Sequence, residues 1–190
     1  MEALQVLGEE HFWIARMLDC LELVAMHERE TGELDGEAAE ELLDLFHSFA
    51  DGRHQEKEER HLFPRIRVHA DAEQETLIQK LEMDHEGDVR HMIRLRSALQ
   101  GAVHGDAVMQ REFSRTALEY VGLERKHMSS ERLVLFPLAE RLLTDGDDKA
   151  MLEAFAKLDP GGPRARERTI ERIALLCEQL GVESGSESTG

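Results

Sequence analysis

Hydrophobic side chains recur every three or four positions along most of the chain, a spacing that predicts helices rather than strands. Asp106 suits the N-cap of the last long helix. Pro64 and Pro137 are expected to end or kink the helices that contain them. The pattern predicts four long helices, at about residues 2–29, 37–63, 72–100 and 107–136.

Short turns at residues 31–36 and 101–106 separate these helices, so we expect neighbours along the chain to run antiparallel. The expected fold is an all-α, antiparallel up-down four-helix bundle with additional C-terminal helices. Residues 147–158 and 164–180 each predict a helix, and the Pro- and Gly-rich stretch 159–163 separates them. The end is rich in Gly, Ser and Glu, which is typical of disorder. We divide the chain into a bundle at 1–143, a helical extension at 144–180 and a disordered tail at 181–190.

Composition narrows the range of partners. The 190-residue chain has a formal net charge of −17, and so acidic a surface repels nucleic acid and anionic membranes, which we do not expect as partners. No apolar run is long enough to cross a bilayer, and no export signal is evident. Cys20 and Cys177 have no metal-binding spacing and are expected to be free thiols, buried or half-buried. We expect a cytoplasmic monomer or homodimer, in which the apolar side of 164–180 folds back or closes the dimer.

One polar motif occurs twice, a His-x-x-x-Glu whose glutamate is followed four residues later by the leucine of a Leu-Phe-Pro. The copies are His54 with Glu58 and His127 with Glu131, and the second lies 73 positions after the first (127 minus 54). Two further histidines follow an acidic residue and keep nearly the same spacing: His11 and His85. The chain therefore consists of two related helical hairpins, each with two histidines and one glutamate.

This spacing carries chemistry because residues four apart on a helix share a face. Each His-x-x-x-Glu can thus aim both side chains at one point between the helices. A single such motif arises often by chance, but its recurrence with matching ends is hard to explain by packing alone. Mixed nitrogen and oxygen donors without thiolate favour iron or manganese over structural zinc. The donors predicted to gather around a pair of metal ions are His11, His54, Glu58, His85, His127 and Glu131.

These residues resemble the hemerythrin-like HHE family over about residues 5–140. The resemblance implies a four-helix bundle around a non-haem di-iron centre. It implies that the four histidines bind the irons, that Glu58 and Glu131 bridge them, and that an oxo or hydroxo group completes the centre. Whether one of the two metals is manganese is left open by the sequence.

The chain departs from the oxygen-carrying hemerythrins on the third helix, where those proteins have a second histidine one turn away. Here the positions one turn from His85 are Leu81 and Val89, which cannot bind a metal. Both irons would then keep an open position, which favours reaction with O2, peroxide or nitric oxide. Two alternatives stay open, namely reversible oxygen or iron binding or sensing without turnover, and an oxidase acting on an organic substrate. Whether the protein is an oxidase- or peroxidase-type enzyme is equally open.

Two other residues are candidates for a role near the metals. His61 lies three residues beyond Glu58 and is a candidate ligand, proton donor or hydrogen-bond partner. Tyr120 lies seven residues before His127 and is a candidate electron or proton donor.

A rival interpretation is the Glu-x-x-His pattern of ferritin-like di-iron proteins. We rank it second, because two of its three copies are not equivalent under the 73-residue repeat and because it leaves His54 and Glu131 without a purpose. The copies are Glu58 with His61, Glu82 with His85, and Glu124 with His127.

Overall fold

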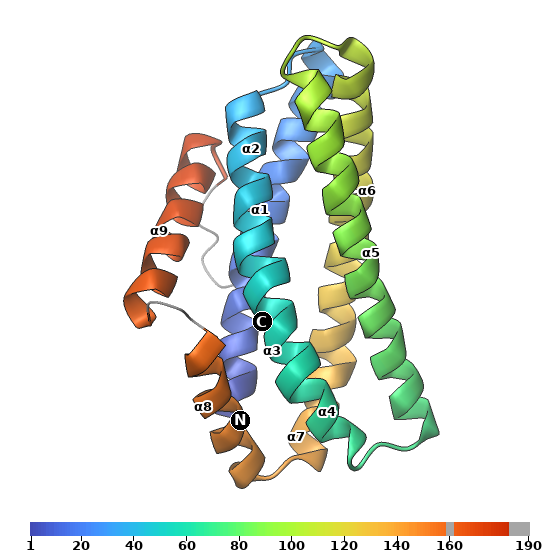
Figure 1. Cartoon of the computed structure of the whole chain (residues 1–190), viewed down its shortest axis with the longest axis vertical. Helices are drawn as coiled ribbons and strands as arrows, with labels where there is room; N and C mark the ends of the chain where they lie inside the picture. Colours follow the sequence, from blue (N-terminus) through green and yellow to red (C-terminus); the bar gives the residue numbers. More distant parts are fainter. Residues whose placement is uncertain (159–161, 183–190) are drawn as a thin grey trace.

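Four long helical segments run side by side along the molecule, and each reverses the direction of the one before it (Figure 1). The computed structural model describes residues 1–158 and 162–182. Every regular element in those residues is helical and none is a strand, which confirms the expected all-α class. The elements are α1 (Glu2–Thr31), α2 (Gly36–Leu45), η1 (Phe46–His54), α3 (Gln55–Lys57), η2 (Glu58–Leu62), α4 (Phe63–Arg67), α5 (Ala72–Ala102), α6 (Ala107–Ser130), η3 (Glu131–Leu135), α7 (Phe136–Leu142), α8 (Asp145–Leu158) and α9 (Pro163–Gln179).

The four segments pack in a ring. α1 contacts α2 and α6, and α5 contacts the same two helices from the other side. The second segment is continuous from α2 to α4, and the fourth is continuous from α6 to α7, with π-helical turns (η1, η2 and η3) within them. The predicted division at residue 143 falls between α7 and α8.

The prediction that Pro64 and Pro137 end or kink their helices is wrong as to the ends, because the helices continue to Arg67 and Leu142. Each proline is the second residue of an α-helix that follows a π-helical turn. Proline lacks an N–H and its ring clashes with the carbonyl four residues earlier in a regular α-helix. The π turn pairs residues five apart and so moves the preceding carbonyls. The π turns begin at Glu58 and Glu131, and the backbone carbonyls of these residues accept the N–H groups of Phe63 and Phe136.

Two apolar clusters divide the interior. The larger contains Leu21, Phe46, Leu95 and Phe113, and the smaller contains Leu4, Leu7, Phe63 and Leu81 at the other end of the helices. On α1 the smaller cluster ends at Leu7 and the larger begins at Ile14, so the buried Glu10 and His11 fall between them. On α5 the same gap holds His85 and Asp88. A band of buried polar side chains therefore crosses the molecule between two apolar layers.

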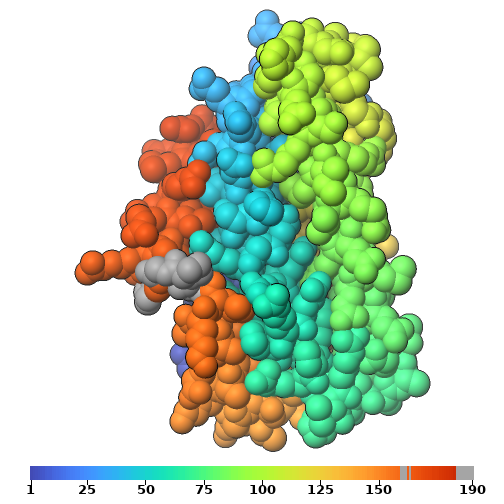
Figure 2. All heavy atoms as spheres, in the orientation of Figure 1, coloured from blue at the N-terminus to red at the C-terminus, as the bar shows by residue number. Residues whose placement is uncertain are grey.

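The C-terminal helices lie against one side of these segments (Figures 1 and 2). On α8 the Asp148 carboxylate accepts the backbone N–H groups of Glu2 and Ala3 at 3.0 and 2.9 Å. These N–H groups have no partner within α1, so α8 caps the first turn of that helix. α9 packs against α1 and α2, and the Arg16 side chain of α1 donates to the Val182 carbonyl at 2.7 Å. The apolar side of the last helix thus folds back onto its own chain.

The predicted disordered tail overlaps the described residues only at Gly181 and Val182, and 183–190 lie outside them. In the Pro- and Gly-rich stretch 159–163 that was predicted to separate the last two helices, residues 159–161 also lie outside the described residues. None of the helices in the described part of the chain has the length and apolar character needed to cross a membrane.

The start of α5 offers a test of the local signals. The Asp71 carboxylate accepts the N–H groups of Glu73 and Gln74 at 3.0 and 2.9 Å, and the Gln74 side chain accepts the Asp71 N–H at 3.0 Å. Asp71→Ala should lower the free energy of unfolding by about 1 kcal/mol because it removes this cap. Asp71→Asn is the matched control and should retain most of the stability, since asparagine also caps helices. Urea unfolding measures both, and equal stability of Asp71→Ala and the parent protein would contradict the assignment.

Candidate metal centre

Six buried side chains from all four long segments point toward one region of the polar band. α1 supplies His11, α5 supplies His85 and α6 supplies His127. The remaining three lie at π-helical turns, where η1 ends and where η2 and η3 begin: His54, Glu58 and Glu131. Since π turns within α-helices often mark functional sites, their coincidence with both His-x-x-x-Glu motifs supports a common purpose.

The six side chains form two overlapping groups. In each group one donor atom per residue lies within 4.8 Å of all the others. Glu58 and Glu131 belong to both groups, whereas each histidine belongs to one. The first group adds His11 and His54, and the second adds His85 and His127.

Each shared glutamate directs one oxygen to each group. In Glu58, Oε1 lies 3.5 Å from His54 Nε2, and Oε2 lies 3.5 Å from His85 Nε2. In Glu131, Oε2 lies 3.2 Å from His11 Nε2, and Oε1 lies 3.1 Å from His127 Nε2. This is the arrangement in which a carboxylate can bridge two cations while imidazoles bind them from the sides.

The donor atoms have too few partners within the protein. The Nε2 atoms of His11 and His54 and all four carboxylate oxygens of Glu58 and Glu131 are buried and accept or donate no hydrogen bond. Buried polar atoms of this kind are costly unless something satisfies them. A pair of cations would satisfy all of them at once, and the nitrogen and oxygen donors fit iron or manganese. The residues present therefore fit a dinuclear centre.

The electrostatics of the cluster also favour cations. Burial alone would lower the pKa of His85, but the neighbouring carboxylates of Glu58 and Glu59 raise it to about 11. Burial would raise the pKa of Glu131, yet the neighbouring imidazoles of His11 and His127 hold it well below its usual range. Without cations the His85 imidazole would therefore carry positive charge beside the carboxylates, and cation binding there would release its proton.

Outer carboxylates orient two of the imidazoles. His54 Nδ1 lies 3.1 Å from Glu10 Oε2, and His85 Nδ1 lies 2.8 Å from Glu59 Oε1. An imidazole that donates from Nδ1 presents a lone pair at Nε2, the atom that faces the cluster. Glu10 also pairs with the buried Lys57. Although burial would raise its pKa, His54 and Lys57 lower the pKa of Glu10 to about 2.

A second pair of carboxyls lies beside the other group. Asp88 follows His85 by three residues, Glu124 precedes His127 by three, and both carboxyls are only 3% exposed. Burial and the neighbouring Asp88 raise the pKa of Glu124 well above its usual range. Burial likewise raises the pKa of Asp51, to about 7, with the Asp88 charge adding to it. Burial and the Asp88 charge therefore favour the protonated, neutral form of the Glu124 carboxyl.

Neither candidate near-site residue joins the two groups. His61 is partly exposed, and its ring lies 6.1 Å from that of Phe155 on α8. The expectation that it shares the inner face of Glu58 assumed an α-helical register, whereas these residues lie in a π turn that holds more residues and carries His61 further round. Tyr120 is fully buried, but its ring packs against Phe46 at 5.4 Å, within the larger apolar cluster.

The ferritin-like set is not assembled. Both oxygens of Glu82 accept hydrogen bonds from Arg67 at 2.7 Å, so this glutamate faces away from the cluster. Glu124 belongs to neither metal group among the described residues, and His61 lies outside both.

The sequence pattern did not indicate Lys57, Glu59 or Asp88 as parts of this site, and it indicated Glu124 only through the ferritin-like alternative. Lys57 and Glu59 are the neighbours of Glu58 in the sequence, and that adjacency was the only sign that they belong to the site. The contact of Glu10 with His54 joins different segments and has no local signal.

Two shallow grooves lead toward the cluster. One, of about 360 Å³, runs between α1 and α6 and includes His11, Phe12 and Met128. The other, of about 280 Å³, runs between α5 and α6 and includes Asp88 and His127. Each group of donors is thus approached from a different side of α6.

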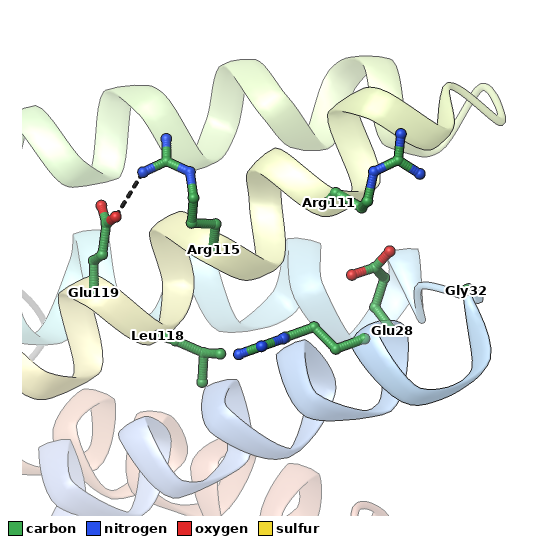
Figure 3. Close-up of a pocket in the computed structure, with 7 residues that line it drawn as sticks. Glu28, Gly32, Arg111, Arg115, Leu118 and Glu119 are labelled. Carbon is green, nitrogen blue, oxygen red and sulfur yellow. Dashed lines mark hydrogen bonds and ion pairs between the residues drawn. The ribbon is translucent and has the colours of Figure 1, made fainter.

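A further pocket, of about 760 Å³, lies between the end of α1 and the start of α6 (Figure 3). Its lining includes Glu28, Arg111 and Arg115, and an ion pair joins Arg115 to Glu119. Glu28 is 17 residues from His11 on the same helix, roughly 25 Å along the axis. This pocket is therefore separate from the candidate metal centre.

Helices that gather four imidazoles and two carboxylates define a candidate dinuclear metal-binding protein. The chain belongs to the hemerythrin HHE cation-binding domain family, whose model matches residues 2–139. This match confirms the resemblance drawn from the repeated motif, and with the two donor groups it indicates a metal-binding protein. No match was found among curated proteins or among solved structures.

The Lys57–Glu10 pair yields a test of the outer contacts. Lys57→Met should lower the free energy of unfolding by roughly 3 kcal/mol, because it leaves the buried Glu10 carboxylate without its lysine partner. The double variant Glu10→Gln/Lys57→Met should recover part of that loss, since no unpaired charge remains. Chemical unfolding of both singles and the double gives the coupling energy, and additive effects would refute the pairing.

Proposed function

We propose that this protein is a non-haem di-iron protein that reacts with O2, peroxide or nitric oxide at a carboxylate-bridged centre of four histidines and two glutamates. The centre would lie inside an antiparallel four-helix bundle, with an oxo or hydroxo bridge between the metals. The observation that carries the proposal is the sharing of Glu58 and Glu131 between two otherwise separate pairs of histidines.

The donor count supports reactivity rather than a closed structural site. Each group contains two imidazoles and two carboxylates, and no other His, Cys, Asp or Glu of the described residues belongs to either. Four protein donors leave room in the coordination sphere of iron, in contrast to structural sites that the protein fills. Each of the two irons would then keep a coordination position open to a small molecule.

Access to the donors limits the size of that molecule. His11 is 8% exposed and His127 is 4% exposed, although a groove adjoins each. Small molecules such as O2, peroxide or nitric oxide can reach nitrogen atoms so nearly covered. An organic substrate would require the helices to move apart. Burial therefore favours the small molecules.

The proton supply also supports reduction of oxygen species. When bound, two ferrous ions supply the two electrons that reduce one peroxide to water, and this reduction consumes two protons. Burial and Asp88 raise the pKa of Glu124 well above its usual range, which favours a protonated carboxyl three residues before His127. It can therefore serve as the proton donor for the second group of ligands.

Metal content is the first test. The protein reconstituted with ferrous iron without oxygen should hold two irons per chain and, after oxidation, show oxo-to-ferric charge-transfer absorption. Glu58→Ala should lose both irons because its carboxylate serves both groups, whereas His11→Ala should weaken only one. His104→Ala, in the exposed turn after α5, is the control and should retain both irons. Retention of two irons by Glu58→Ala would rule out the shared carboxylate.

The proton donor provides a second test. Glu124→Gln should bind two irons but react with peroxide at least about tenfold more slowly in single-turnover stopped-flow measurements, because the carboxyl proton is lost. Glu119→Gln, on the exposed face of the same helix, is the matched control. Unchanged rates in Glu124→Gln would remove this residue from the proposal. Fully reversible spectral changes with O2 and no peroxide reaction would indicate a carrier instead.

A further inference from the structure

The two cysteines meet inside the fold. Cys20 lies on α1 and Cys177 lies on α9, and their sulfur atoms are 3.1 Å apart. Both are free thiols, 0% and 1% exposed. Because they are 157 positions apart, only the packing of α9 onto α1 brings them together.

The contact is a hydrogen bond between unlike partners. The Cys20 thiol donates to the sulfur of Cys177. This bond lowers the pKa of Cys177 to about 7, burial opposes the shift, and the Arg16 guanidinium adds to it. The same bond raises the pKa of Cys20 far above its usual range. A thiolate with a thiol in contact is the arrangement in which a first cysteine is oxidised and a second resolves it.

We propose that Cys20 and Cys177 are a reversible disulfide site, oxidised by hydrogen peroxide, that ties the C-terminal helix α9 to α1. The site lies in the larger apolar cluster and uses none of the proposed metal donors.

The chemistry balances with peroxide as the only oxidant. The Cys177 thiolate attacks one peroxide oxygen, the O–O bond breaks, and the released hydroxide takes a proton to become water. The sulfenic acid formed on Cys177 is then attacked by the Cys20 sulfur, which loses its proton. The S–OH bond breaks and a second water leaves. Two thiols give up two electrons and one peroxide becomes two waters.

Access to the buried sulfurs follows from how α9 is held. Only three of its described side chains are buried, namely Ile173, Leu176 and Cys177. Two of its ion pairs, Arg172 with Glu41 and Arg166 with Glu9, lie at the surface, where such pairs add little stability, and a longer one of 3.8 Å joins Arg166 to the buried Glu10. We therefore expect α9 to loosen locally without unfolding of the rest of the chain, which admits peroxide to the Cys177 sulfur.

Oxidation would strengthen the weak attachment of α9 to the rest of the fold. A bond between residues so distant in the chain restrains the unfolded state strongly. It would also hold α9 closed, so that Arg16 stays covered by the end of that helix through its bond to the Val182 carbonyl. Thiols in contact in a reducing compartment respond in this way to transient oxidant.

Mass spectrometry of the full-length protein tests the site. Reduced protein is treated with hydrogen peroxide, blocked with N-ethylmaleimide under denaturing conditions and analysed without reductant. We expect each chain to lose two hydrogens and take up no maleimide, with a cross-linked peptide joining the two cysteines that dithiothreitol releases. Repeating the experiment with oxidised glutathione separates the thiol chemistry from any reaction of peroxide with bound metal.

Serine variants supply the matched controls. In Cys20→Ser the reaction should stop at the sulfenic acid of Cys177, which a sulfenic-acid probe labels. In Cys177→Ser the probe should leave Cys20 unlabelled. The urea midpoint of the oxidised parent protein should exceed that of the reduced protein, and neither variant should show this difference. Two blocked thiols per chain after both oxidants, or cross-links only between chains, would overturn the proposal.

Discussion

The carboxylates of Glu58 and Glu131 lie between two pairs of imidazoles, and each offers one oxygen to either pair. Removing such charges from water is unfavourable unless groups of opposite charge lie beside them in the interior. Protonated imidazoles can do so in the absence of metal, and cations can do so more fully. The apolar layers on both sides matter because they exclude the water that would otherwise satisfy these oxygens.

The surroundings make the two halves of the centre unequal. Near His54 the carboxylate of Glu10 is ionised, held by Lys57 and by the imidazole itself. Near His127, burial and the Asp88 charge raise the pKa of Glu124 and so oppose ionisation of its carboxyl. A duplicated motif thus lies in two environments, one with an ionised carboxylate held by an ion pair and the other with a carboxyl whose ionisation is opposed.

The C-terminal helices lie outside the family match, which ends at residue 139. They are nevertheless built into the fold, because Asp148 caps α1 and the Arg16 side chain of α1 bonds to the Val182 carbonyl. Both contacts fall on the helix that carries His11. The C-terminal extension therefore contacts the helix that supplies one of the proposed donors. Cys20 and Cys177 lie at this contact.

The sequence by itself determined the helical class, the family and the six proposed donors, because helix periodicity and the i, i+4 relation are local and the motif occurs twice. The tertiary structure decided which side chains meet across helices. The contacts of Glu10 with His54 and of Cys20 with Cys177 depend on helix rotation and docking, which no local spacing encodes. His61 shows the limit of a regular-helix assumption, since a π turn carried it away from the cluster.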